Sequence, residues 1–124
     1  MPLKGRVVPI LRIFDVSKAL DFYVAFLGFA EDWRHQFEPD LPVYMQVSRD
    51  GIALHLSEHH GDGSPGSAIR IESDDLDAYC AALLAKKYRY YRPGIIETEW
   101  KTRELSVVDP FHNRIVFWAP VTSG

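Results

Sequence analysis

The predicted secondary structure has the same order in both halves of the chain, and this repeat constrains the fold more than any other feature of the sequence. Each half starts with a strand, continues with apolar residues at helical spacing, and ends with three further strands. In the first half the elements are a strand at 7–14, a helix from Val16 to Leu27, and strands at 29–37, 43–48 and 52–57. A unit of about sixty residues that occurs twice indicates two copies of one supersecondary structure.

The second half contains the matching elements after a loop at 58–66. They are a strand at 67–72, a helix with Leu76, Tyr79, Cys80, Leu83 and Leu84 on one face, a broken strand region at 88–96, and strands at 103–108 and 114–118. Candidate N-caps precede both helices, namely Asp15 and Ser17 in the first half and Ser73 and Asp74 in the second. This order predicts an α+β fold with mixed sheets that carry the helices on one side.

The strands at 43–48 and 52–57 form a predicted hairpin around Asp50-Gly51, a dipeptide that favours tight hairpin turns. Alternation along the two strands separates an apolar face from a mixed one. The apolar face carries Met45, Val47, Ile52, Leu54 and Leu56, and the mixed face carries Tyr44, Gln46, Ser48, Ala53, His55 and Ser57. His55 is therefore expected beside the polar side chains of Tyr44 and Gln46.

Composition excludes several classes of protein. With 124 residues, of which 47% are apolar, the chain fits one compact domain. The net charge of −3 and the interspersed Lys and Arg provide no basic stripe, so we expect no nucleic-acid partner. No run approaches the roughly twenty apolar residues of a membrane helix, and the first residues show no exporting run. Because the single cysteine, Cys80, cannot form an internal disulfide, the expected location is the cytoplasm.

Five short segments of the chain match the pattern of a known superfamily. They are Pro9-Ile10-Leu11 with Asp15-Val16, Ala19-Leu20-Asp21-Phe22-Tyr23, Leu27-Gly28-Phe29, Trp100-x-x-Arg103-Glu104, and Asp109-Pro110-x-x-Asn113-Arg114. Together they resemble the vicinal oxygen chelate superfamily of glyoxalases, dioxygenases and bleomycin resistance proteins. The fourth segment resembles the Trp-Gly-x-Arg-Glu signature of the bleomycin resistance branch, with Lys101 in place of glycine. His112 occupies another position where this family commonly has glycine, a residue that adopts positive φ at little cost.

The resemblance implies a single vicinal oxygen chelate domain over residues 1–124. Module one would span about 6–58 and module two about 67–120, joined by the loop at 58–66. Each would be a βαβββ module, and their strands would form a curled mixed sheet with an open concave cleft and helices on its outer face. Members of the superfamily usually complete such clefts with a second subunit, so the resemblance also implies a homodimer.

Metal-dependent members place four ligands in the cleft, one on the first and one on the fourth strand of each module. The corresponding positions here are Val8, His55, Ala68 and Val116, of which three are hydrocarbon. A catalytic divalent metal needs at least three His or carboxylate ligands, so the resemblance predicts a site without metal or other cofactor. His59 and His60 complete a His-x-x-x-His-His string, but that spacing aligns ligands on a helix, whereas this segment leaves a strand for a loop.

The candidate ligand-binding residues are aromatic and polar side chains on strands and loops that the resemblance places around the cleft. They are Trp100, His55, Tyr44, Gln46, Trp33, Phe37, Arg70, Arg103 and Trp118. Trp100 is the leading candidate because an indole stacks on planar heterocycles; its alternative is to cover the domain edge or the dimer interface. His55 either binds a ligand or is satisfied by Gln46. Trp33 and Phe37 line either the cleft or a subunit contact.

The arginines have two interpretations. Strand alternation places Arg12, Arg70 and Arg114 opposite the helix-packed face. Glu72 and Glu104 could pair with the arginines in a structural ion-pair network, which we expect rather than direct recognition of an anionic ligand.

These features predict a binding protein rather than an enzyme, with no catalytic residues. The expected function is metal-independent antibiotic resistance, in which a dimer cleft sequesters a flat, polar drug of the bleomycin type and breaks no bond. The mild acidity of the chain suits a cationic ligand. Two alternatives remain: a metal-dependent lyase or dioxygenase of the glyoxalase superfamily, built on His55, another histidine and a nearby glutamate, and a small-metabolite binding protein.

Overall fold

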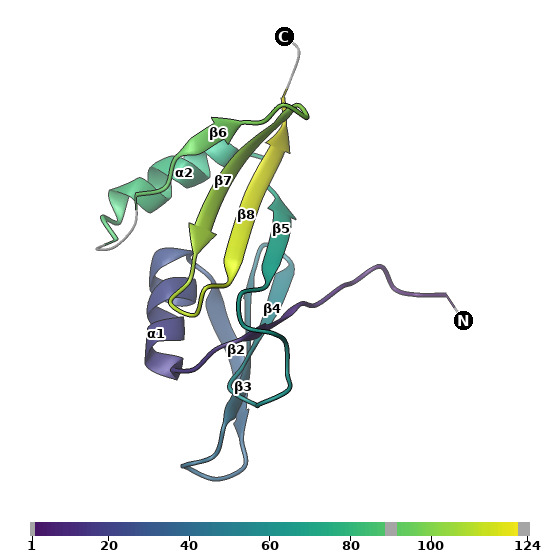
Figure 1. The fold of residues 1–124 in the computed structure, drawn as a ribbon, viewed down its shortest axis with the longest axis vertical. Coiled ribbons are helices and arrows are strands. Elements are labelled where there is room, and N and C mark those ends of the chain that lie inside the picture. Colours follow the sequence, from purple (N-terminus) through teal and green to yellow (C-terminus); the bar gives the residue numbers. More distant parts are fainter. Residues whose placement is uncertain (1, 89–91, 122–124) are drawn as a thin grey trace. The chain divides into compact units, whose positions relative to one another are not determined.

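The computed structural model describes residues 2–88 and 92–121. The chain divides into two compact units, Met1–Pro65 and Gly66–Gly124 (Figure 1). Each unit contains one mixed sheet of four strands together with helical structure. The predicted α+β fold of two βαβββ modules is therefore confirmed.

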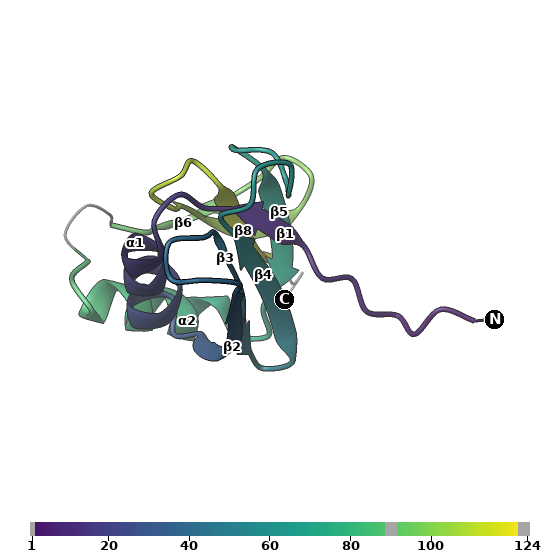
Figure 2. The ribbon, with the colours of Figure 1, turned by 90° about the horizontal axis from the view of Figure 1, so that it is seen from below.

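The first unit has the element order expected from its sequence. Its elements are β1 (Ile10–Arg12), α1 (Val16–Leu20), η1 (Asp21–Phe26), β2 (Ala30–Gln36), β3 (Val43–Arg49) and β4 (Ile52–Ser57). The strands lie in the order β1-β4-β3-β2, with β1 parallel to β4 and the other pairs antiparallel. β1 is shorter than predicted because Pro9 has no N–H to donate and contributes only its carbonyl, which accepts from the backbone N–H of His55. Figure 2 shows the segment before β1 running away from the sheet.

The first helix differs from the single helix predicted between Val16 and Leu27. α1 is α-helical and its N-cap is Asp15, whose side chain accepts from the backbone N–H of Lys18. From Asp21 the helix widens to π geometry, and the backbone N–H of Leu27 donates to the carbonyl of Phe22 over 2.9 Å. The wider turn buries the aromatic residues Phe22, Tyr23 and Phe26, each at most 1% exposed.

β2 contains a β-bulge that the regular alternation of the sequence does not predict. Glu31 pairs with Val47, and the next paired residue is Trp33, which lies opposite Gln46. Asp32 is therefore an extra residue without a cross-strand partner in this register. The hairpin of β3 and β4 has the predicted faces, since Gln46 lies opposite His55, Met45 opposite Leu56 and Val47 opposite Leu54. Ile52, at the start of β4, lies opposite Arg49.

The second unit repeats the arrangement. Its elements are β5 (Ala68–Glu72), α2 (Leu76–Ala85), β6 (Ile95–Glu97), β7 (Thr102–Val108) and β8 (Arg114–Pro120), and its strand order is β5-β8-β7-β6. The N-cap of α2 is Asp75, which accepts from the backbone N–H of Ala78. The expected caps Ser73 and Asp74 were therefore wrong, because the helix begins at Leu76. In the predicted strand region at 88–96, the strand begins only at Ile95, and residues 89–91 lie outside the described residues.

Each unit buries one face of its sheet. In the first unit Met45, Val47, Leu54 and Leu56 are at most 1% exposed, and in the second Leu105, Val107, Ile115 and Phe117 are at most 4% exposed. Tyr79 of α2 packs edge-on against Phe117, with 4.8 Å between ring centroids. Strand alternation then places Glu104 and Trp118 on the face opposite α2. Within the described residues no helix is long and apolar enough to cross a membrane.

Candidate functional site

In the first unit, four polar side chains on β2, β3 and β4 form a continuous chain of hydrogen bonds, which we term the His55 network. The Tyr44 hydroxyl lies 2.7 Å from Nδ1 of His55, and Nε2 of His55 lies 3.0 Å from Oε1 of Gln46. The Gln46 side-chain N–H donates to Oδ2 of Asp32 over 2.9 Å. The prediction that His55 shares a face with Tyr44 and Gln46 is confirmed, and Gln46 is also its hydrogen-bond partner.

The hydrogen bonds of Gln46 determine which ring nitrogen of neutral His55 carries the proton. Because the Gln46 amide nitrogen donates to the Asp32 carboxylate, the Gln46 oxygen faces His55 and can only accept. Nε2 of His55 therefore carries a proton, and Nδ1 of the neutral ring accepts from the Tyr44 hydroxyl. Burial lowers the pKa of His55 below its ordinary 6.5, which favours the same neutral imidazole. Burial, followed by the charge of Asp62, raises the pKa of Tyr44, so its hydroxyl keeps the proton that it donates.

Trp33 extends the His55 network with an aromatic surface. Its ring stacks on Tyr44, with 6.1 Å between centroids and 12° between planes, and meets His55 edge-on at 5.3 Å. The side chain is still 43% exposed, so a ring held by two neighbours presents surface to a ligand. Phe37 is not part of this group. It follows the end of β2, is 83% exposed, and its ring meets His35 edge-on at 5.9 Å.

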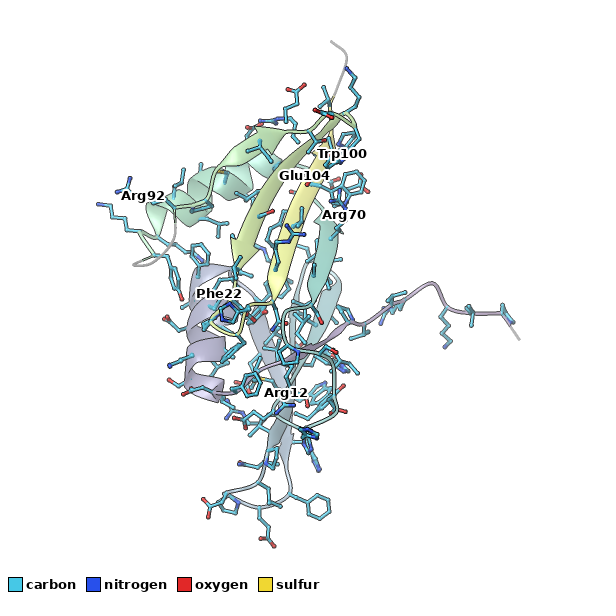
Figure 3. All side chains as sticks on the ribbon, in the orientation of Figure 1. Arg12, Phe22, Arg70, Arg92, Trp100 and Glu104 are labelled. Atoms are coloured by element: carbon cyan, nitrogen blue, oxygen red, sulfur yellow. The ribbon has the colours of Figure 1, made fainter. Side chains whose placement is uncertain are left out.

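In the second unit, three donors from different segments converge on one oxygen of the Glu104 carboxylate. We use the term Glu104 cluster for Glu104, its three donors and Trp118, namely Arg70, Trp100, Thr102, Glu104 and Trp118. Oε2 of Glu104 on β7 accepts from the Thr102 hydroxyl over 2.8 Å and from Arg70 Nη2 over 2.9 Å. The Trp100 indole N–H donates to the same oxygen over 3.2 Å. Figure 3 shows Arg70, Trp100 and Glu104 gathered at one end of the sheet. The hydrogen bonds from Arg70 and Thr102 lower the pKa of Glu104, so this carboxylate is ionised near neutral pH.

Two indole rings belong to the Glu104 cluster. Trp118 lies directly opposite Glu104 on β8, and the Arg70 guanidinium lies over its ring, 5.5 Å from the centroid. Trp100 is 66% exposed although its N–H is engaged. Glu104 thus orients the Trp100 ring without covering it. A flat apolar surface of defined orientation is suited to stacking on a planar ligand.

Arg103 lies apart from the other candidate residues of the second unit. It precedes Glu104 on β7 and therefore points to the opposite face of the sheet. There its guanidinium makes two hydrogen bonds of 2.8 Å to the Asp77 carboxylate at the start of α2. The structure thus brings together Arg70, Trp100 and Trp118, while Arg103 connects the sheet to the helix.

The residues at the superfamily's metal positions do not fit a metal. Val8 is 38% exposed, Val116 is 3% exposed, and neither these two nor Ala68 has a side-chain donor atom. His55 has two ring nitrogens, but both are engaged by Tyr44 and Gln46. Across residues 2–88 and 92–121, no group of three or more His, Cys, Asp or Glu side chains could hold a metal ion. His59 lies beside Tyr44, with 6.4 Å between the two rings.

A shallow hollow in the first unit has a volume of about 240 Å³. It is lined by Phe14, Asp40, Leu41, Pro42 and Glu58. One oxygen of Glu58 accepts from the backbone N–H of Val43 and so helps to hold the start of β3. The hollow contains none of the side chains predicted to bind a ligand.

Two βαβββ modules, each with a polar and aromatic face, define the class of protein. A family model described as "Glyoxalase superfamily protein" matches residues 3–124, and the chain therefore belongs to the glyoxalase superfamily. The expected membership of the glyoxalase, bleomycin resistance and dioxygenase superfamily is confirmed. No curated protein matches the chain significantly.

Solved structures of bleomycin-binding proteins have the same fold. A bleomycin-binding protein from bleomycin-producing Streptomyces verticillus, complexed with copper(II)-bleomycin, is 26% identical, with a TM-score of 0.72 over 99% of this chain and 100% of that one. A glyoxalase/bleomycin resistance protein from Streptomyces sp. CB03234 is also 26% identical, with a TM-score of 0.67 over 89% and 96%. Another bleomycin-binding protein, complexed with bleomycin, is 18% identical with a TM-score of 0.72 over 93% and 98%, a likeness of fold alone.

Two residues of these groups were not among the sequence candidates. Asp32 ends the His55 network only because the bulge in β2 brings an additional residue to that face. Thr102 donates to Glu104 from two residues away on the same strand, so strand alternation alone could have identified it. Glu104 itself was expected as an arginine partner, and its pairing with Arg70 is confirmed.

Proposed function

We propose that this protein is a metal-independent binding protein that confers antibiotic resistance by sequestering a bleomycin-type drug, acting as a homodimer in the cytoplasm. The observation that carries the proposal is the Trp100 indole, which Glu104 orients while 66% of the residue stays exposed. A flat polar drug can stack on such a ring without any bond being broken. The family membership and the fold shared with bleomycin-binding proteins support the same conclusion.

The chemistry of the two groups supports binding rather than catalysis. In the His55 network both imidazole nitrogens are engaged, so His55 is not available as a metal ligand or as a free general base. In the Glu104 cluster the carboxylate oxygen Oε2 already accepts from three donors. These groups are suited to hold aromatic rings in fixed orientations, which lowers the entropic cost of stacking a ligand.

The proposal is tested by isothermal titration of the chelator-treated protein with a bleomycin. We expect saturable binding near one ligand per subunit and weaker binding by Trp100→Ala. Trp100→Phe keeps a flat ring but loses the N–H that donates to Glu104. Its affinity for the drug should therefore lie between that of the unchanged protein and that of Trp100→Ala. Leu84→Ala removes an exposed apolar side chain of α2, which covers the other face of the sheet, and serves as the matched control.

Three outcomes would contradict the proposal. One is an absence of saturable heat with a bleomycin. A second is an equal loss of affinity in Trp100→Ala and Leu84→Ala. The third is a stoichiometric zinc, nickel, manganese or iron that survives dialysis against a chelator and is required for binding, which would favour the metal-dependent lyase or dioxygenase.

A further inference from the structure

The Glu104 cluster contains one cation and one anion, and their exposure decides which of them a ligand can reach. The Glu104 side chain is 9% exposed, whereas the Arg70 side chain is 47% exposed. One oxygen of Glu104 is also occupied by three donors from the protein. Of this ion pair, the partner that a ligand can reach is therefore the guanidinium of Arg70. Glu72, opposite Trp118, and Arg114 are further exposed charges on the same face of the sheet.

The Arg70 side chain is held in place by its neighbours, yet several of its N–H donors are available to a ligand. Glu104 accepts from Nη2 on one edge of the guanidinium, and the Trp118 ring lies beneath its plane. A guanidinium has five N–H donors in a rigid fork. Among residues 2–88 and 92–121, its hydrogen bonds go to Glu104 alone. Because the side chain is already ordered, a ligand that binds the remaining donors loses little rotamer entropy.

We propose that the Glu104 cluster recognises a planar aromatic group bearing a carboxylate, with the ring on Trp100 and the carboxylate on the free donors of Arg70. The inference rests on the proposed function in one respect: it assumes that this face of the second sheet binds the ligand. It adds which part of a flat polar ligand contacts the Glu104 cluster. The fork of Arg70 matches the two oxygens of a carboxylate, whereas an ammonium in the same place would meet like charge. Any cationic part of a ligand therefore lies away from the Arg70 guanidinium.

Glu104 acts in this proposal as a positioning residue. It fixes Arg70 from one side and Trp100 from another, so a single carboxylate sets the relation between the ion-binding and ring-binding parts. Thr102 holds that carboxylate from the same strand. Glu104→Gln removes the charge that orients Arg70 and leaves the size of the side chain almost unchanged. We expect it to weaken the discrimination between charged probes more than it weakens the binding of an uncharged one.

The experiment uses three probes with one ring system: 2-naphthoate, 2-naphthamide and 2-naphthylmethylammonium. Each is titrated into the full chain, and binding is followed by NMR at the Trp100 indole N–H and the Arg70 Nε–H. We expect 2-naphthoate to bind on the order of tenfold more tightly than the ammonium probe, with the amide between them. Arg70→Met should reduce the ratio of the 2-naphthoate affinity to the ammonium-probe affinity to about one. Arg70→Lys should lose most of the preference for 2-naphthoate because an ammonium lacks the fork of donors.

The matched control is Arg92→Met, which makes the same charge change away from the cluster, as Figure 3 shows. It should leave the preference for 2-naphthoate intact. The inference is overturned if no probe shifts the Trp100 resonance saturably, if the ammonium probe binds as tightly as the carboxylate, or if Arg92→Met and Arg70→Met reduce the preference equally. A thermal melt of each variant identifies loss of folding, and Arg70→Lys then provides the comparison at constant charge.

The result separates this inference from the proposed function. If 2-naphthoate is preferred through Arg70 but bleomycin does not bind, the drug assignment fails and the carboxylate site stands. If bleomycin binds and loses affinity in Trp100→Ala while the probes show no preference, the drug assignment stands and the carboxylate site fails.

Discussion

Arg103 and Glu104 are adjacent on β7 but form their ion pairs on opposite faces of the second sheet. Arg103 pairs with Asp77 of α2 at 2.8 Å, and Glu104 pairs with Arg70 of β5 at 2.9 Å. Two residues of one sequence motif therefore have separate roles. The first attaches a helix to the sheet, and the second organises the face on which we place the ligand.

Removing the Arg103 pair should affect stability only slightly. Arg103→Met breaks an exposed ion pair, and such pairs contribute little because water and salt screen them. We expect a small decrease in the urea midpoint that shrinks further at high salt. Asp77→Asn should give the same decrease, and the double variant should add nothing to it. A large loss that persists in high salt would show that Arg103 has a further structural role.

The stability of the protein should decrease as the pH falls past the titration of His55. In the unfolded chain this histidine has its ordinary pKa of 6.5, and burial lowers the pKa in the folded chain. The contribution of neutral His55 to the free energy of unfolding is thus complete above about pH 6.5. It is lost as the pH falls through the lower pKa of the folded chain, because His55 of the unfolded chain takes up its proton first. Urea unfolding from pH 8 to pH 5 measures the effect.

His55→Gln provides the control for this pH dependence, since it lacks the titrating imidazole and should flatten that part of the profile. NMR of the ring nitrogens tests the same arrangement directly. The proton should lie on Nε2, with Nδ1 unprotonated at neutral pH, because the Gln46 oxygen beside Nε2 can only accept. A proton on Nδ1 would contradict the described direction of the network.

Gly63→Ala should destabilise the protein more than Gly61→Ala does. Both glycines have positive φ, +68° and +97°, so alanine is strained at either position by about 1–2 kcal/mol. A Cβ on Gly63 would also lie 2.7 Å from the backbone carbonyl oxygen of Ile10, whereas nothing lies within 4 Å at Gly61. The additional clash should cost about 1–3 kcal/mol. Equal unfolding free energies for the two variants would show that the loop shifts freely away from β1.

Glycine substitutions at two other positions should stabilise the protein. Lys101 and His112 have φ of 67° and 70°, and they occupy the positions where the resembled family has glycine. Lys101→Gly and His112→Gly relieve the left-handed strain, offset in part by the greater entropy of glycine in the unfolded chain. We expect each to raise the free energy of unfolding by up to about 1 kcal/mol. Glu99→Gly in the same loop gains no such relief, so it should destabilise.

Local patterns were sufficient to predict much of the candidate site. The Asp50-Gly51 turn and strand alternation predicted that His55 would face Gln46, and the register confirms it. Alternation likewise placed Arg70 on the face away from the helix, and Glu104 was one of two glutamates expected to pair with an arginine. These predictions succeeded because the side-chain period of a strand depends only on its own backbone. The roles of these residues toward a ligand remain predictions.

By itself, the sequence determined the repeated strand and helix order and the hairpin faces, since each depends on residue type or local spacing. The unfavourable residues at the metal positions followed from the resemblance to the superfamily. Only the tertiary structure decided that β2 bulges at Asp32, that the first helix widens after Leu20, and that Asp75 caps α2. It also decided that Trp100, Thr102 and Arg70 converge on one oxygen of Glu104. A bulge and a convergence of donors depend on how separate strands pair, and that pairing is settled by the packing of the whole sheet.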